Sequence, residues 1–116
     1  MHKDKASITD ILDSMRLAVT YLGAMTLEDF EHSIEKVDSV CRRLEIIGEA
    51  TKRLSGELRD QHPTIPWRTM AGMRDRLIHG YEVVRIDRIY EAVTVVIPPL
   101  IPMLAAIAQS LPDPDE

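Results

Sequence analysis

The chain has 116 residues, 45% of them hydrophobic and 28% charged, and its 14 basic and 19 acidic side chains give a net charge of −5. This length suits a single domain, residues 1–116, which can bury a core without a disulfide or a structural metal. Cys41 is the only cysteine, which excludes an internal disulfide and leaves too few ligands for a structural zinc site. The charged N-terminus lacks the pattern of a signal peptide, so we expect a cytoplasmic protein.

The first half of the sequence has the spacing of two amphipathic helices. Apolar residues recur at steps of three and four from Ile8 to Leu22, which predicts a helix from about Asp4 to Tyr21 that stops at Gly23. Thr26, followed by Asp29 three residues later, resembles a capping box. The apolar spacing then continues to Leu54, which predicts one long helix, bent near His32. Gly48 inside it is expected to mark a close helix crossing.

Two further helices are predicted in the second half. Ser55-Gly56 and His62-Pro63 bracket a short turn of helix or loop, and Pro66 lies near the start of a third helix that reaches Gly80. A fourth helix begins at Ile86 and is expected to kink at Pro98, Pro99 and Pro102. These prolines and the lack of a basic flank argue against a membrane span. The predicted fold is an all-α, up-and-down four-helix bundle with a proline-kinked C-terminal helix.

The positive charge is concentrated in the middle of this acidic chain. Residues 42–90 hold ten basic and seven acidic side chains. A local positive potential can hold phosphates even on an acidic protein. Pairs within one helix, such as those of Arg42 and Arg43 with Glu45 and Glu49, explain part of the pattern equally well. The candidate RNA-binding residues are Arg42, Arg43, Lys52, Arg53 and Arg76.

The segment Arg74–Tyr81 contains the side chains best suited to phosphate binding and proton transfer. Arg74 and His79 are five residues apart, about 140° around a helix, so they converge only if the helix ends near His79. Gly80 supplies such an end. Asp75, four residues before His79, is placed to accept a ring N–H and fix the tautomer. Arg74 is suited to hold a phosphate with two N–H groups, and His79 to move a proton. The alternative is that both only cap a helix end.

A family resemblance rests on three segments in this order: 43–50 (RLEIIGEA), 65–67 (IPW) and 74–81 (RDRLIHGY). Together they resemble the HepT-like branch of the HEPN domain proteins over about residues 8–95. The resemblance implies an all-α fold and a metal-independent ribonuclease, with Arg74 and His79 as catalytic residues of an Arg-x4-His motif. Asp75 stands where Asn is commoner in the family, which adds a negative charge near the phosphate.

The resemblance also implies a biological setting. Such proteins are toxins of type II or VII-like toxin–antitoxin systems, paired with an MNT-type nucleotidyltransferase antitoxin. That enzyme adds AMP to the tyrosine two residues after the histidine, a position that Tyr81 occupies here. The alternative for Tyr81 is a phenol that packs the helix end. No cofactor is expected.

A metal-free mechanism follows from the chemistry of RNA. The 2′-OH attacks its own phosphodiester when a base, an acid and a charge stabiliser are in place. One His79 per chain is one short of the usual pair, and a two-fold dimer would supply the second. We therefore expect a homodimer. A non-catalytic HEPN module that binds nucleotide, or presents substrate to a partner nucleotidyltransferase, is the alternative.

Overall fold

The protein is described here by a computed structural model that covers residues 3–79 and 85–113, except the side chains of residues 74–79. These residues form helices and contain no strand. In chain order the elements are α1 (Asp4–Leu22), α2 (Leu27–Glu31), α3 (Ile34–Lys52), α4 (Gly56–Gln61), α5 (Trp67–His79), α6 (Ile86–Glu91), the π-helical segment η1 (Ala92–Val96) and α7 (Ile97–Ser110). The predicted all-α fold is confirmed.

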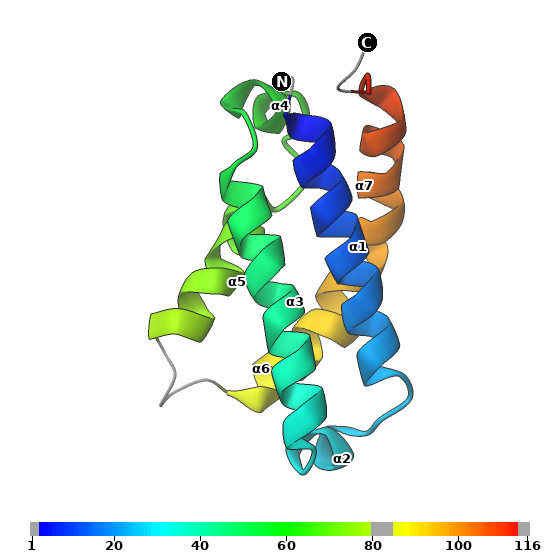
Figure 1. Cartoon of the computed structure of the whole chain (residues 1–116), viewed down its shortest axis with the longest axis vertical. Helices are drawn as coiled ribbons and strands as arrows, with labels where there is room; N and C mark the ends of the chain where they lie inside the picture. Colours follow the sequence, from blue (N-terminus) through cyan, green and yellow to red (C-terminus); the bar gives the residue numbers. More distant parts are fainter. Residues whose placement is uncertain (1–2, 80–84, 114–116) are drawn as a thin grey trace.

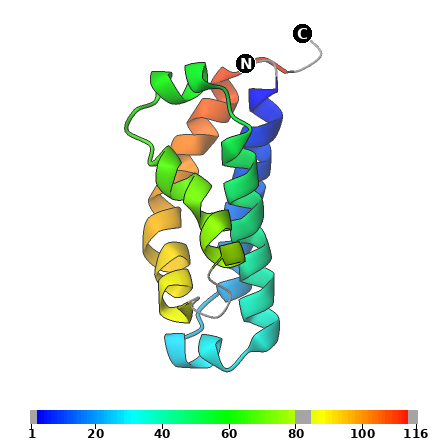
Figure 2. The same ribbon diagram turned by 90° about the vertical axis from the view of Figure 1, so that its left-hand side faces the viewer.

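The long helices run alternately down and up the molecule (Figures 1 and 2). Helix α1 packs against α3 on one side and against α7 on the other, and α5 packs against the opposite side of α3. Fully buried side chains from α1, α3 and α7 fill the centre, among them Ile8, Met15, Ile47 and Leu104. The order is that of an up-and-down bundle in which α6, η1 and α7 together make the fourth helix.

The end of the first helix is where the sequence predicted it. Gly23 has a φ of 54°, and its amide donates to the Val19 carbonyl oxygen (2.9 Å). A residue with a side chain is strained in this left-handed conformation, so glycine is the natural stop.

The second predicted helix is two helices, because the chain breaks rather than bends after Glu31. The Thr26 hydroxyl accepts the Asp29 amide (3.1 Å), as the capping pattern indicated, but the helix it starts ends after five residues. The Ser33 hydroxyl then accepts the Lys36 amide (3.3 Å) and starts α3. A second N-cap so soon after the first favours two separate helices over one bent helix.

The irregular part of the fourth helix lies before the prolines, not at them. In η1 the Ile97 amide donates to the Ala92 carbonyl oxygen, five residues earlier. Pro98 and Pro99 follow directly at the start of α7, and Pro102 lies inside α7. A π turn and a proline inside a helix are both usual causes of a kink, and both lie in the region where the sequence predicted one.

The helix from Ile86 to Ser110 has the length and apolar composition of a membrane span, and 28% of its most apolar 18-residue window is buried. Its start is held by the Tyr90 hydroxyl, which donates to the Met25 carbonyl oxygen (2.8 Å), and by a ring contact between Tyr90 and Phe30. These contacts fix α6 against α2. The helix is thus an integral part of the bundle.

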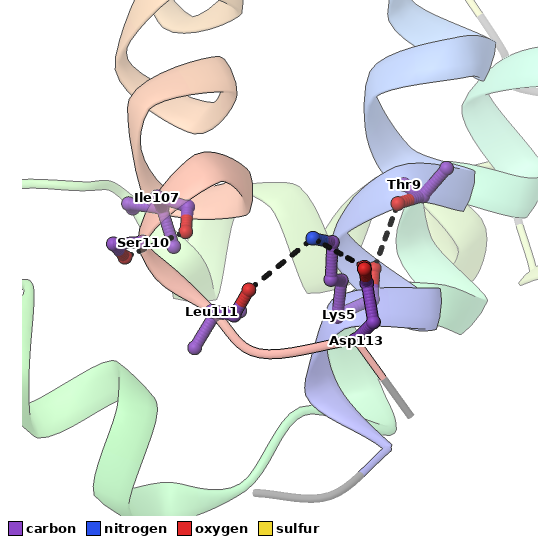
Figure 3. A network of polar contacts seen from close by, with 6 residues as sticks. All are labelled: Lys5, Thr9, Ile107, Ser110, Leu111 and Asp113. Carbon is purple, nitrogen blue, oxygen red and sulfur yellow. Dashed lines mark hydrogen bonds and ion pairs between the residues drawn. The ribbon is translucent and has the colours of Figure 1, made fainter. Parts of the chain in front are cut away.

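The two ends of the described chain meet at one end of the bundle (Figure 3). The Lys5 ammonium donates to the Leu111 carbonyl oxygen (3.2 Å) and pairs with the Asp113 carboxylate (2.8 Å). Next to it, the buried Asp4 carboxylate accepts the Ser55 amide (2.9 Å) and hydroxyl (2.7 Å). These contacts join the start of α1 to the end of α7 and to the start of α4.

Candidate active site

The segment with the predicted catalytic residues belongs to α5, whose beginning is fixed by the preceding loop. The Trp67 indole N–H donates to the His62 carbonyl oxygen (2.9 Å), and the Met70 amide donates to the Pro66 carbonyl oxygen (3.0 Å). Trp67, Met70 and Met73 are buried. The core therefore holds α5 by the residues before Arg74, and the motif occupies the remainder of the helix.

Arg74 and His79 both lie in α5, whose described residues reach His79, and the predicted end at Gly80 lies outside the described residues. On a continuous helix of 100° per residue, the two Cα positions are about 140° apart, whereas Asp75 and His79 are about 40° apart. The side chains of Arg74, Asp75, Arg76 and His79 lie outside the described residues, as does all of Tyr81. Their catalytic, orienting, RNA-binding and AMP-acceptor roles stay predictions.

The end of α5 is compatible with both interpretations of the motif. The last carbonyl groups of a helix have no partner within it, so an arginine and a histidine there can serve as caps. A helix end is also the place where the following chain, or a second copy, can approach both residues. The structure describes α5 as far as His79 and does not describe residues 80–84, so the backbone does not decide between the two interpretations.

The basic residues predicted to bind RNA along α3 do not form one free surface. Arg42 is exposed and pairs with Glu45 in the next turn (3.3 Å), and Arg53 pairs with Asp10 of α1 (3.4 Å). Two of the predicted cations are therefore already neutralised in part, although exposed pairs of this kind are weak and can exchange for a phosphate.

Arg43 and Lys52 lie on opposite sides of α3. Nine residues separate them, which is about 180° around a helix. Lys52 is exposed, whereas Arg43 is half-buried, with its Nε shielded from solvent and without a hydrogen-bond partner among the described residues. The two residues therefore leave α3 in opposite directions, and the RNA-binding roles of Arg42, Arg43, Lys52 and Arg53 stay predictions.

The structure assigns Arg59 a role that the sequence did not indicate. Its Nη2 donates to the carbonyl oxygens of Lys52 (3.3 Å) and Leu54 (2.8 Å), which lie at and just beyond the end of α3. A cation here satisfies carbonyl groups that the helix leaves open and complements its dipole. Arg59 is thus a structural cap. The signal was absent from the sequence because the contact depends on how α4 folds back on α3.

Neither the Cys41 thiol nor a metal-binding cluster provides a second candidate site among the described residues. Burial, together with the negative charges of Asp38 and Glu45, raises the pKa of Cys41 to about 11, so its thiol is protonated and unreactive near neutral pH. Among the residues that the structure describes, no three His, Cys, Asp or Glu side chains stand together as a metal site. Among the groups with chemistry that the sequence analysis singled out, the α5 motif is thus the strongest candidate.

Comparison with known proteins gives the family. Residues 11–107, from the middle of α1 through most of α7, match the family described as "Ribonuclease HepT-like". The chain belongs to this HepT-like family. The matched segment contains the whole of α5, and with it both motif residues.

Three relatives of this HepT-like chain are similar over most of their lengths. A Thermococcus cleftensis protein named "Probable ribonuclease HepT" is 39% identical over 99 residues, which cover 85% of this chain and 88% of that protein. A Methanocaldococcus jannaschii protein named as an RNase is 32% identical over 97% of this chain and 93% of its own length. One from Caldanaerobacter subterraneus, also named as an RNase, is 35% identical over 94% and 97%. No solved structure matches the chain.

Proposed function

We propose that this protein is a metal-independent endoribonuclease and the toxin of a toxin–antitoxin system, with Arg74 and His79 as its catalytic residues. The observation that carries the proposal is the family match, which includes the whole helix that bears Arg74 and ends at His79. Several relatives with similar length are named as RNases. The reducing cytoplasm, where RNA is present, is the proposed location.

The proposed reaction uses the 2′-OH of RNA as the nucleophile. A base removes the 2′ proton, the 2′ oxygen bonds to phosphorus, and the P–O5′ bond breaks as an acid protonates the 5′ oxygen. The products are a 2′,3′-cyclic phosphate and a 5′-OH, and no added water or metal is needed. His79 supplies the proton transfers, and Arg74 stabilises the charge on the phosphate oxygens through its planar fork.

A dimer completes this mechanism. A base and an acid are both required, and each chain contributes one histidine to the motif. A two-fold axis between two α5 ends would bring together two copies of His79 and two of Arg74. Asp75 is proposed to orient the ring of the His79 that lies about 40° from it on the same helix.

Regulation is proposed through Tyr81 and an MNT-type nucleotidyltransferase antitoxin. The Tyr81 oxygen would attack the α-phosphate of ATP, which releases pyrophosphate and leaves AMP on the phenol. A bound phosphate anion two residues after His79 would occupy the place of the RNA phosphate. The intact mass of wild type should increase by one AMP after treatment with such an enzyme and ATP, whereas Tyr81→Phe should stay unchanged.

The experiment that tests the catalytic proposal is a denaturing gel of tRNA and total RNA incubated with purified, unmodified protein in EDTA. Wild type should cleave, and His79→Ala should be slower by at least about 100-fold, because general acid–base catalysis contributes that much. His32→Ala is the matched control, since His32 is exposed and its Nδ1 contacts only the Glu28 carbonyl oxygen among the described residues.

Each result has a definite meaning. Cleavage by wild type and His32→Ala but not by His79→Ala supports the proposal. No cleavage by wild type, with Tyr81 unmodified by intact mass, would favour a non-catalytic module that binds nucleotide or presents substrate to the transferase. Cleavage only after addition of Mg²⁺ would contradict the metal-independent mechanism.

A further inference from the structure

Helix α5 lies at the edge of the bundle, and one of its sides faces away from the other helices (Figures 1 and 2). Arg68 and Thr69 are exposed on it, and Gly72 is half-exposed. On a helix of about 100° per residue, the Cα positions of Arg68, Gly72 and His79 fall within about 40° of one another. We call this the outer side of α5, and it leads along the helix to the proposed catalytic position.

Nothing in the described part of the chain requires a glycine at position 72. Gly72 lies in the interior of α5, where glycine is less favourable than alanine. Among the described glycines only Gly23 has a positive φ, so the backbone angles of Gly72 suit any residue. A Cβ built on Gly72 meets no described atom within 4 Å, apart from the neighbouring backbone of its own helix. A bare backbone at this point allows a close approach from outside the chain.

The charge on this part of the chain favours an anion. Residues 61–74 contain no aspartate or glutamate, although the whole chain has 19 acidic side chains. The Arg68 guanidinium forms no hydrogen bond or ion pair with the residues that the structure describes. Arg42 and Arg53, by contrast, already pair with carboxylates. A cation without a neighbouring acid is the better placed of these to hold a phosphate.

We propose that the RNA substrate lies along the outer side of α5, with one phosphate held by Arg68 and the strand passing close to the backbone at Gly72. The inference rests on the proposed ribonuclease, whose catalytic residues belong to the same helix. Arg68 and His79 are eleven residues apart, about 17 Å along the helix axis. Arg68 therefore holds a phosphate remote from the cleaved bond, and this remote contact positions the bond at the catalytic residues.

The outer side of α5 is fixed in place before RNA binds. The Trp67 indole N–H donates to the His62 carbonyl oxygen (2.9 Å), and the side chain of Met70 is fully buried. A surface that is already ordered loses little entropy when a ligand binds. The exposed Thr69 hydroxyl, one turn before Gly72, adds a second donor that can reach a phosphate or a 2′-OH.

An apolar protein surface is a poorer occupant of the same side. The exposed large hydrophobic residues of the described chain are Ile34, Val95 and Met103, which lie in α3, η1 and α7. The described residues on the outer side of α5 offer a cation, a hydroxyl and a bare backbone instead. Contacts of this kind suit the phosphates and sugars of a nucleic acid.

The first test measures RNA binding apart from cleavage, by the fluorescence anisotropy of end-labelled tRNA in EDTA. Every chain carries His79→Ala, so that the RNA stays intact. Adding Arg68→Glu should raise the dissociation constant at least about tenfold and lower the salt dependence of binding by about one counterion or more. Arg16→Glu is the matched control, because Arg16 is exposed on α1 and its guanidinium also has no described partner. It should bind tRNA like the parent chain.

The second test separates a binding role of Gly72 from a structural one. Gly72→Leu has room for its side chain and gains helix propensity, so its melting temperature should equal or exceed that of the parent. Its dissociation constant for tRNA should nevertheless rise at least about tenfold, because the side chain holds the strand away from the helix. Gly56→Leu is the control, since a Cβ on Gly56 also meets no described atom within 4 Å. It should leave tRNA binding unchanged.

Three results would overturn the inference. Arg68→Glu and Gly72→Leu could bind tRNA like the parent, Arg16→Glu could weaken binding as much as Arg68→Glu does, or Gly72→Leu could melt at a lower temperature, which would assign the glycine to packing. Cleavage is measured in parallel on chains that retain His79. A protein that binds tRNA along α5 without cleaving it contradicts only the nuclease, and equal kcat/KM in all four variants contradicts only the RNA path.

Discussion

At the scale of single residues, the geometry of a guanidinium sets what Arg74 can do. Its planar fork donates two parallel N–H groups to a phosphate, whereas a lysine ammonium acts as a point charge. We expect Arg74→Lys to lose at least about tenfold in cleavage rate, since removing a donor to developing charge typically costs more. The rate is measured on tRNA in EDTA.

Arg16→Lys is the control for this prediction. Arg16 is exposed on α1, so its replacement keeps the charge and leaves the motif unchanged. It should retain the wild-type rate. Equal rates for wild type and Arg74→Lys would mean that Arg74 holds no phosphate, and would favour its alternative role as a cap.

A second residue, Asp4, contributes stability rather than chemistry. It is 2% exposed, and its carboxylate accepts the amide and hydroxyl of Ser55 across the end of the bundle. Asp4→Ala should lower the free energy of unfolding by about 1–3 kcal/mol, because it leaves two donors without their acceptor. Urea unfolding followed by circular dichroism measures the change.

The comparison for Asp4 is Asp10→Ala on the same helix. The Asp10 carboxylate is half-exposed and meets Arg53 at 3.4 Å. Its loss should cost at most about 1 kcal/mol. Equal effects of the two substitutions would show that the Asp4–Ser55 contact adds nothing beyond a surface ion pair.

At the scale of elements, the break between α2 and α3 shows how a local hydrogen bond can interrupt a periodic sequence. The apolar spacing continues through His32 and Ser33, and for that reason it predicted one helix. The Ser33 hydroxyl accepts the Lys36 amide, and it starts a new helix instead of continuing the old one. Periodicity reports which side chains are buried, and capping decides where a helix begins.

Removal of the Ser33 cap should therefore destabilise the protein. Ser33→Ala is expected to lower the free energy of unfolding by about 1 kcal/mol, the usual cost of a lost N-cap. Ser39→Ala on the same helix is the control, because the Ser39 hydroxyl donates only to the Glu35 carbonyl oxygen of the preceding turn. A stability of Ser33→Ala equal to that of Ser39→Ala would show that the cap does not hold the start of α3.

The fourth helix shows that the effect of prolines on a helix also depends on the turns around them. The sequence places three prolines in one apolar run, and a kink at them was the natural prediction. The chain also forms a π turn just before them, with Pro98 and Pro99 at the start of α7 and Pro102 inside it. Which turn absorbs the mismatch depends on how α6 and α7 pack, and this cannot be seen in a local pattern.

At the scale of the whole molecule, the proposed active site needs two chains. Cleavage per chain should therefore fall when the protein is diluted below the dissociation constant of the dimer, and addition of an inactive His79→Ala chain should change the rate through mixed dimers. The measurement is the initial rate of RNA cleavage over a dilution series of wild type. A constant rate per chain in samples shown by mass to be monomers would contradict a two-chain site.

The sequence by itself determined the helical class, the extent of α1, the stop at Gly23 and the start of α5 near Pro66, and it left a turn of helix or a loop open after Ser55. These features depend on side-chain spacing and on caps within a few residues, which the chain carries locally. It also identified the Arg74–Tyr81 segment, since motif order survives without knowledge of the fold. The chemical roles of Arg74 and His79 within it remain predictions.

The tertiary structure decided what local spacing cannot express. It paired Arg53 with Asp10 of α1, and it assigned Arg59 to the carbonyl groups at the end of α3. It also showed that the apolar fourth helix buries one side and leaves Val95 and Met103 exposed. Each of these facts depends on which helix packs against which, and packing is a property of contacts between residues far apart in the chain.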